Sequence, residues 1–326
     1  MSFDAYSAEA TTTKSDKPTV DYAALNQYVV DTCQLQQPET LQGVISVIVD
    51  LGTQKLPDAQ YKLDAEDKDL SIEELNEKYA DELASGKVSK FDKAYDNDSK
   101  SWLIHKFVPE KDRQAIVYAV DFPEIMLDKG QFFGGESNPK PLRLWFGGQF
   151  YQKSQGKMLV QNMIPLKVTK ADNVDGWTMN PKSSLYKMAV AAKVIKQNDQ
   201  FLPQDIDKLL GKTLQFKAQV FFKKGNDGKE YYTEKVSFAA GLARGQSERE
   251  IENTYLVQFN KPNNPEALKE LRKHIINTIE NATNFEGSII QKELLDVRPQ
   301  TFTKSETSTK VVETKGSVVT DDSDIW

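Results

Sequence analysis

Two alternating segments, residues 212–223 and 231–239, constrain the fold more than any other feature of this chain. Alternate side chains of a β-strand point to opposite faces of its sheet, so a strand with one apolar face has to place that face in a core. The apolar positions are Leu214, Phe216, Ala218, Val220, Phe222, Tyr232, Val236 and Phe238. The connection, residues 224–229, contains two glycines and an asparagine, which favour a tight turn. The sequence therefore predicts a β-hairpin with one buried face and one exposed face.

The opposite face of the predicted hairpin carries lysines interleaved with aromatic residues. Lysine cations neutralise phosphates and release counterions, and aromatic rings stack on bases for roughly 1–3 kcal/mol per base. The candidate binding residues of the hairpin are Lys217, Phe221, Lys223, Lys224, Lys229, Tyr231 and Lys235. Because every base has a ring face, such a surface predicts binding of single-stranded nucleic acid with little dependence on base sequence.

A strand predicted over residues 141–151 repeats this arrangement. Its inward positions are Leu142, Leu144, Phe146 and Phe150. Its outward positions and the lysine that follows the strand add Arg143, Trp145, Tyr151 and Lys153 to the candidate binding residues. An alternative stays open, in which Trp145 and Phe221 pack beneath a second layer, because β-domains often carry aromatic residues on both faces.

The order of the predicted elements indicates the fold class. Strands are predicted over residues 42–51, 114–122, 141–151, 158–170, 212–223 and 231–239, and helices over 20–30, 183–196 and 265–279. Three or more strands, then a helix, then a hairpin is the order of the OB-fold, a five-stranded barrel. We therefore expect a mainly β, α+β protein with an OB-fold-like barrel and a C-terminal helix. Other β folds with one helix also fit this order.

Charge is distributed unevenly along the chain. The net charge is −6, yet residues 101–300 carry +6, whereas residues 58–100 alone carry −6. A positive body with acidic extensions is compatible with a polyanionic partner. Ser71 and Glu74 have the spacing of a helix capping box within residues 58–100. We interpret these 43 residues as an acidic, partly helical insertion that forms a solvated lid or brace.

The chain is expected to form one domain with extensions at both ends. We predict a disordered lead-in over residues 1–18, a single OB-like domain over 19–300 and a flexible linker with an acidic tail over 301–326. No apolar run approaches the roughly 20 residues that span a bilayer, and the N-terminus lacks the pattern of a signal peptide. A cytoplasmic location without a membrane partner is therefore expected.

Composition argues against several classes of enzyme. Cys33, His105 and His274 are the only cysteine and histidines, and their spacing is not that of a zinc site. The Gly-Lys-Thr triplet at residues 211–213 lacks the upstream glycine of a phosphate-binding loop, and no Gly-x-Ser-x-Gly elbow is present. We therefore expect no metal, no cofactor and no catalysis, although metal-assisted chemistry at paired carboxylates stays open.

The C-terminal end combines acidic residues with a terminal aromatic ring. The candidate partner-binding residues are Asp321, Asp322, Asp324, Ile325 and Trp326. A ring can fill a pocket on a partner protein while the carboxylates meet basic residues. Without a partner, the same segment can compete with a polyanion for the chain's own cationic surface.

This ending resembles the acidic C-terminal tip of bacterial and bacteriophage single-stranded DNA-binding proteins. Residues 210–232 and the turn within them also resemble the last two strands of OB-folds in phage replication proteins. The resemblance covers this hairpin segment and the six-residue tip. It implies a protein that coats single-stranded DNA during replication, recombination or repair, with a tail that recruits a polymerase, helicase or primase.

Other functions remain compatible with the residues. A virion or scaffold protein would use the β-domain and the tail for protein contacts alone. An RNA-binding module would use the same stacking surface, because preference for a 2′-hydroxyl is not visible in the sequence. The sequence also leaves homo-oligomer formation open.

Overall fold

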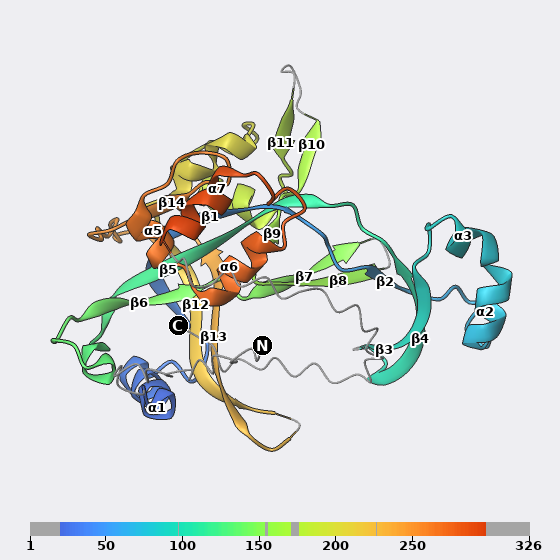
Figure 1. Ribbon diagram of the computed structural model, residues 1–326, viewed down its shortest axis with the longest axis horizontal. Coiled ribbons are helices and arrows are strands. Elements are labelled where there is room, and N and C mark those ends of the chain that lie inside the picture. Colours follow the sequence, from blue (N-terminus) through green and yellow to red (C-terminus); the bar gives the residue numbers. More distant parts are fainter. Residues whose placement is uncertain (1–19, 97, 154–155, 171–175, 226, 298–326) are drawn as a thin grey trace, which may run out of the picture.

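The computed structural model describes residues 20–96, 98–153, 156–170, 176–225 and 227–297, with the side chains of residues 149–153 outside this description. The predicted lead-in and acidic tail therefore lie outside the described residues. The described chain is mixed α/β and consists mostly of strands (Figure 1). Its larger sheet is antiparallel along the order β13-β12-β1-β5-β6. The end strands β6 and β13 come into contact, so the sheet nearly closes into a barrel.

The strands of this barrel-like sheet are β1 (Glu39–Gln54), β5 (Arg113–Leu127), β6 (Lys140–Trp145), β12 (Thr213–Lys224) and β13 (Glu230–Ala240). The short strands β14 (Tyr255–Val257) and β9 (Ile164–Pro165) pair with β1 and β5. The first half of β1 pairs with β12 and its second half with β5. A Cβ atom at Gly43, near the change of partner, would collide with Val120, Phe122 and Phe216. This close approach requires glycine.

The prediction that the first strand ends at residue 51 is wrong. β1 continues to Gln54, with an irregular register between Asp50 and Thr53. Gly52 has a φ of +73°, which glycine adopts without the steric cost that a side chain would impose. The glycine therefore allows the strand to bend and continue.

Helices cover the barrel and complete its core. They are α1 (Tyr22–Cys33), α4 (Ser184–Ala191), α5 (Pro265–Lys269), α6 (Lys273–Glu280) and α7 (Ile289–Val297), with 3-10 turns η1 (Gly130–Phe133) and η2 (Pro203–Leu209). Apolar residues on α1 and α6, such as Leu25, Val29, Ile275 and Ile279, are fully buried. Burial of each such side chain contributes about 1.5–3 kcal/mol. No helix among the described residues is long and apolar enough to cross a membrane.

A second sheet forms an arm beside the barrel and follows the order β3-β4-β2-β8-β7. Its elements are β2 (Ala59–Lys62), α2 (Ile72–Lys78), α3 (Ala80–Ala84), β3 (Lys90–Asp96), β4 (Ser101–Val108), β7 (Gly148–Lys153) and β8 (Gly156–Gln161). Figure 1 shows α2 and α3 at the end of the arm that is remote from the barrel. The predicted capping box is confirmed, since Ser71 accepts from Glu74 N and the Glu74 carboxylate accepts from Ser71 N. The insertion expected to be partly helical also contains the strands β2 and β3, and β3 pairs with β4.

Several predicted elements are divided in the structure. The strand expected over residues 141–151 separates into β6 and β7, which belong to different sheets, with Gly147 and Gly148 at the break. The strand expected over 158–170 becomes β8, β9 and β10 (Val168–Lys170), and β10 pairs with β11 (Trp177–Met179). The final predicted helix, over 265–279, is divided into α5 and α6, and α7 follows without having been predicted.

Candidate nucleic-acid interface

The predicted two-faced hairpin is confirmed in β12 and β13. Leu214, Phe216, Ala218 and Val220 are fully buried on one face. On the opposite face, the cross-strand pairs are Lys217 with Ser237, Gln219 with Lys235, Phe221 with Thr233 and Lys223 with Tyr231. None of these eight side chains is a carboxylate, so the outward face of the hairpin is cationic and otherwise neutral.

The five hairpin lysines predicted as binding residues all lie on the protein surface. Lys217, Lys223, Lys224, Lys229 and Lys235 are exposed. Lys224 has the opposite strand parity and pairs with Glu230, so it and Lys229 border the turn instead of the cationic face. The hairpin itself extends past the barrel, as Figure 1 shows. A linear polyanion therefore has lysine charges available along this extension.

Two aromatic rings lie between these lysines. Phe221 and Tyr231 are both half-buried. The Lys235 ammonium lies 5.0 Å from the centre of the Phe221 ring, a cation–π contact. The Tyr231 hydroxyl donates to Asp227 Oδ2 at 2.7 Å, and this hydrogen bond lowers the pKa of Asp227. Both rings are thus oriented by hairpin neighbours, and Lys235 has to move aside before a base can stack on the ring face that it covers.

The outward position predicted for Trp145 is wrong, and Arg143 is engaged in an ion pair within the protein. Trp145 is 5% exposed and belongs to the main core, together with Leu144 and Phe146. It is still paired with Ala119 of β5, so both faces of β6 are covered at this end, as in the alternative in which Trp145 packs beneath a second layer. Arg143 is half-buried and forms a bidentate pair with Asp121, with Nε to Oδ1 at 2.7 Å and Nη2 to Oδ2 at 3.0 Å. The buried carboxylate of Asp121 needs this cation. Neither side chain is free to meet a nucleic acid.

The remaining predicted site residues are not brought to the hairpin. The backbone of Tyr151 and Lys153 lies in β7 of the arm sheet, and their side chains lie outside the described residues. The tail residues Asp321, Asp322, Asp324, Ile325 and Trp326 also lie outside them. The described part of the candidate interface therefore consists of the hairpin residues alone.

The arm carries an exposed aromatic pair that sequence reasoning missed. Tyr95 and Trp102 are 44% and 65% exposed, and their rings meet edge to face at a centroid distance of 6.0 Å. They are a cross-strand pair of β3 and β4, and the exposed Lys93 lies two residues before Tyr95 on the same face. A signal was present, because Phe91, Lys93 and Tyr95 alternate with other residues as in a strand. The acidity of the insertion concealed it.

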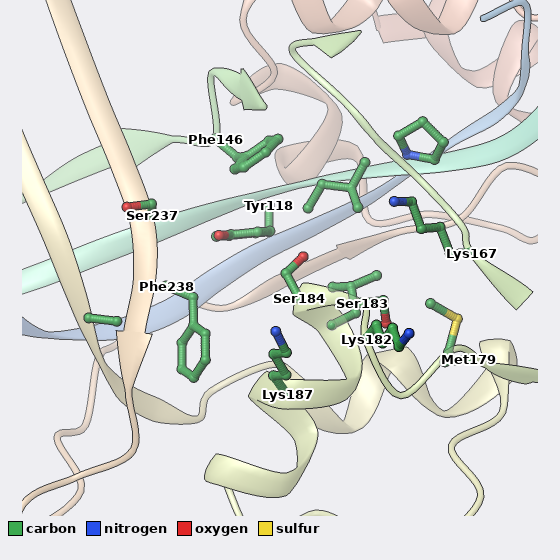
Figure 2. Close-up of a pocket in the computed structure, with 14 residues that line it drawn as sticks. Tyr118, Phe146, Lys167, Met179, Lys182, Ser183, Ser184, Lys187, Ser237 and Phe238 are labelled. Carbon is green, nitrogen blue, oxygen red and sulfur yellow. The ribbon is translucent and has the colours of Figure 1, made fainter. Parts of the chain in front are cut away.

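A pocket of about 490 Å³ opens between β5, β13 and the start of α4 (Figure 2). Its rings are Tyr118, Phe146 and Phe238, and the Tyr118 and Phe146 centroids are 5.5 Å apart. Its cations are Lys167, Lys182 and Lys187, and no carboxylate lines it. Sequence reasoning did not find this pocket, because its rings come from three separate segments.

Buried ionisable groups elsewhere serve the fold. Glu234 accepts from Arg272 Nη1 at 2.8 Å on the inner face of β13, and the charge of Arg272 helps to keep the pKa of Glu234 low although burial alone would raise it. Burial raises the pKa of the Cys33 thiol to about 11. Among the described residues, no group of three or more His, Cys, Asp or Glu side chains is placed to hold a metal ion.

Comparisons with known proteins give no relative for this chain: no family model, no curated protein and no solved structure matches it.

Proposed function

We propose that this chain binds single-stranded DNA without catalysis and with little dependence on base sequence. The observation that carries the proposal is the outward face of the β12–β13 hairpin. Along it, Lys217, Lys223 and Lys235 alternate with Phe221 and Tyr231, and no carboxylate lies among the four cross-strand pairs of this face. Cations at this spacing serve phosphates and rings serve unstacked bases, which a duplex does not offer.

The strand order supports an OB-like barrel as the scaffold of this surface. If β1, β5, β6, β12 and β13 are taken as strands one to five, the observed order is five-four-one-two-three, and α4 lies between strands three and four. That is the order and the helix position of an OB-fold, in which the loop between the last two strands commonly contacts nucleic acids. In this assignment the β12–β13 turn is that loop, and most of the arm lies between strands one and two.

The tail completes the proposal through the resemblance to phage and bacterial single-stranded DNA-binding proteins. We propose that residues 321–326 recruit a polymerase, helicase or primase during DNA replication, recombination or repair. The acidic residues would meet a basic patch on the partner, and Trp326 would fill a pocket there. This part of the proposal rests on the sequence alone.

Titration of a labelled oligo-dT with the full-length protein tests the proposal. Fluorescence anisotropy at about 50 and 200 mM salt should show tight binding that weakens steeply as salt rises. A duplex of the same length should bind weakly, and oligo-rU measures the preference between DNA and RNA. Absence of oligo-dT binding at the lower salt concentration would refute the proposal.

A second candidate is an assembly protein that makes protein contacts only. The exposed pair of Tyr95 and Trp102 favours it, because large exposed rings often mark protein-binding surfaces. Analytical ultracentrifugation with and without oligo-dT separates the two candidates. A stable homo-oligomer that ignores oligo-dT would support assembly, whereas an oligo-dT complex supports the first proposal.

A further inference from the structure

The pocket beside α4 has the size of a small-ligand site. Its volume of about 490 Å³ lies within the roughly 300–1,000 Å³ of typical ligand pockets. Phe238 on β13 forms one wall, and Tyr118 on β5 and Phe146 after β6 form an aromatic floor. Figure 2 shows the side chains of Ser184 and Lys187 rising from α4 toward Tyr118. The cavity is therefore apolar and aromatic at its base and polar at its opening.

The charge of this opening selects the kind of ligand. Lys182 and Lys187 are exposed, and within the described chain neither takes part in an ion pair. No acidic residue lines the pocket, and the Ser184 hydroxyl lies near Tyr118 (Figure 2). A simple anion would not need three rings, and a purely apolar ligand would not need lysines. A nucleotide has the required combination of flat aromatic base and phosphate.

The pocket adjoins the cationic face of the hairpin. Ser237 lines the pocket and is also the cross-strand partner of Lys217. Lys235 lies two residues before Ser237, on the same face of β13. A strand held along Lys223, Lys235 and Lys217 therefore comes to β13 at Ser237, and the next residue, Phe238, forms the pocket wall on the other face of this strand.

We infer that this pocket receives one unstacked nucleotide of a bound single strand, with its base against Phe238 and the aromatic floor and its phosphate at Lys182 and Lys187. This inference rests on the proposed function. In this arrangement one base is enclosed in the pocket, and the other bases stack on solvent-exposed rings of the hairpin. The cost of unstacking one base is a few kcal/mol in a duplex and lower in a flexible single strand, so oligo-dT is a suitable probe.

Photo-crosslinking of the full-length protein tests the placement directly. Oligo-dT that carries 5-iododeoxyuridine at single positions forms adducts with aromatic side chains on which the modified base lies. After irradiation and proteolysis, mass spectrometry should find an adduct on Phe238, Tyr118 or Phe146. Adducts confined to Phe221, Tyr231 or the arm, with the oligonucleotide bound, would overturn the inference and leave the proposed function intact. Absence of any oligonucleotide binding would overturn both.

A pair of matched double variants tests the phosphate contacts. Lys182→Ala with Lys187→Ala should weaken oligo-dT binding about tenfold and lower the salt slope by about two units. The control, Lys193→Ala with Lys196→Ala, removes the same charge from exposed positions outside the pocket and should change affinity less than about twofold. Equal losses in both double variants would show that only general surface charge matters, and would contradict a phosphate site at the pocket. All variants are exposed lysines, and circular dichroism checks that they fold.

Discussion

The β12–β13 hairpin and strand β6 carry the same alternation of cations and rings, yet the structure uses them in opposite ways. On the hairpin, Lys217 and Lys235 face solvent beside neutral cross-strand partners. On β6, Arg143 lies opposite Asp121 of β5 and pairs with it. The difference lies in the neighbouring strand. A cation is left for an external anion only where the adjacent strand supplies no carboxylate.

The largest expected effect separates the two regions by stability. Arg143→Ala leaves the buried carboxylate of Asp121 without its cation and should destabilise the protein by about 3–5 kcal/mol. Urea denaturation followed by circular dichroism measures this loss. Below the unfolding transition, the variant should still bind oligo-dT. Lys140→Ala is the matched control. The Lys140 side chain is 64% exposed and its ammonium lies 3.8 Å from Glu270, a long and solvated ion pair, so this variant should change stability by less than about 1 kcal/mol.

An unchanged stability for Arg143→Ala would contradict this account of β6. If the Arg143→Ala variant kept the stability of the unmodified protein but lost affinity for oligo-dT, Arg143 would be part of the binding surface. The double variant Arg143→Met with Asp121→Leu removes both charges together. It should recover most of the stability, because a buried ion pair is often replaceable by apolar residues of similar volume.

For the hairpin, substitutions should lower the affinity for oligo-dT more than they lower stability. Phe221→Ala removes a half-buried ring from the cationic face and should weaken oligo-dT binding by about 1–3 kcal/mol. Phe221→Tyr keeps a stacking ring and should retain most of the affinity. Anisotropy titration gives both values, and urea denaturation gives the accompanying change in stability. If Phe221→Ala lowered the stability of the protein while the folded variant kept its affinity for oligo-dT, the ring would be a packing residue like Trp145.

How far each region could be predicted depends on how local its determinants are. The hairpin was predictable because the alternation, the turn glycines and the strand lengths all lie within residues 212–239. The inner and outer faces of β6 were not, because burial of Trp145 depends on β5 and on the core around it. Strand parity alone cannot show whether the outer face of a strand is covered by a second layer. The aromatic pocket was out of reach for the same reason, since β5, β13 and the end of β6 meet only in the folded chain.

The arm illustrates a different limit. The alternation of Phe91 and Tyr95 was visible, yet the excess of acidic residues around it favoured a solvated insertion. Leu75, Val88 and Phe91 form a small core of their own, so the arm is a folded unit with apolar contacts inside an acidic surface. Net charge per segment reports on solvation and not on strand formation.

A smaller effect should distinguish the lysines of the two regions by salt dependence. Lys217→Ala and Lys223→Ala should each lower the slope of log affinity against log salt by about one unit, because each removes one phosphate contact. Lys140→Ala, at the first residue of β6, should leave the slope unchanged. Titrations of oligo-dT at four or more salt concentrations provide the slopes. Equal slopes for all three variants would remove the proposed distinction between the hairpin and β6.

The smallest expected effect concerns the acidic tail. Deletion of residues 321–326 removes three aspartates and should preserve or slightly raise oligo-dT affinity, since these carboxylates can compete with phosphates for exposed lysines. The gain should be largest at low salt and should disappear in a variant that lacks Lys217 and Lys235, because the tail then has lost its cationic target. The gain should persist when Lys140, the first residue of β6, is replaced instead. Weaker oligo-dT binding after the deletion would show that the tail assists the hairpin, and the competitor role would then be rejected.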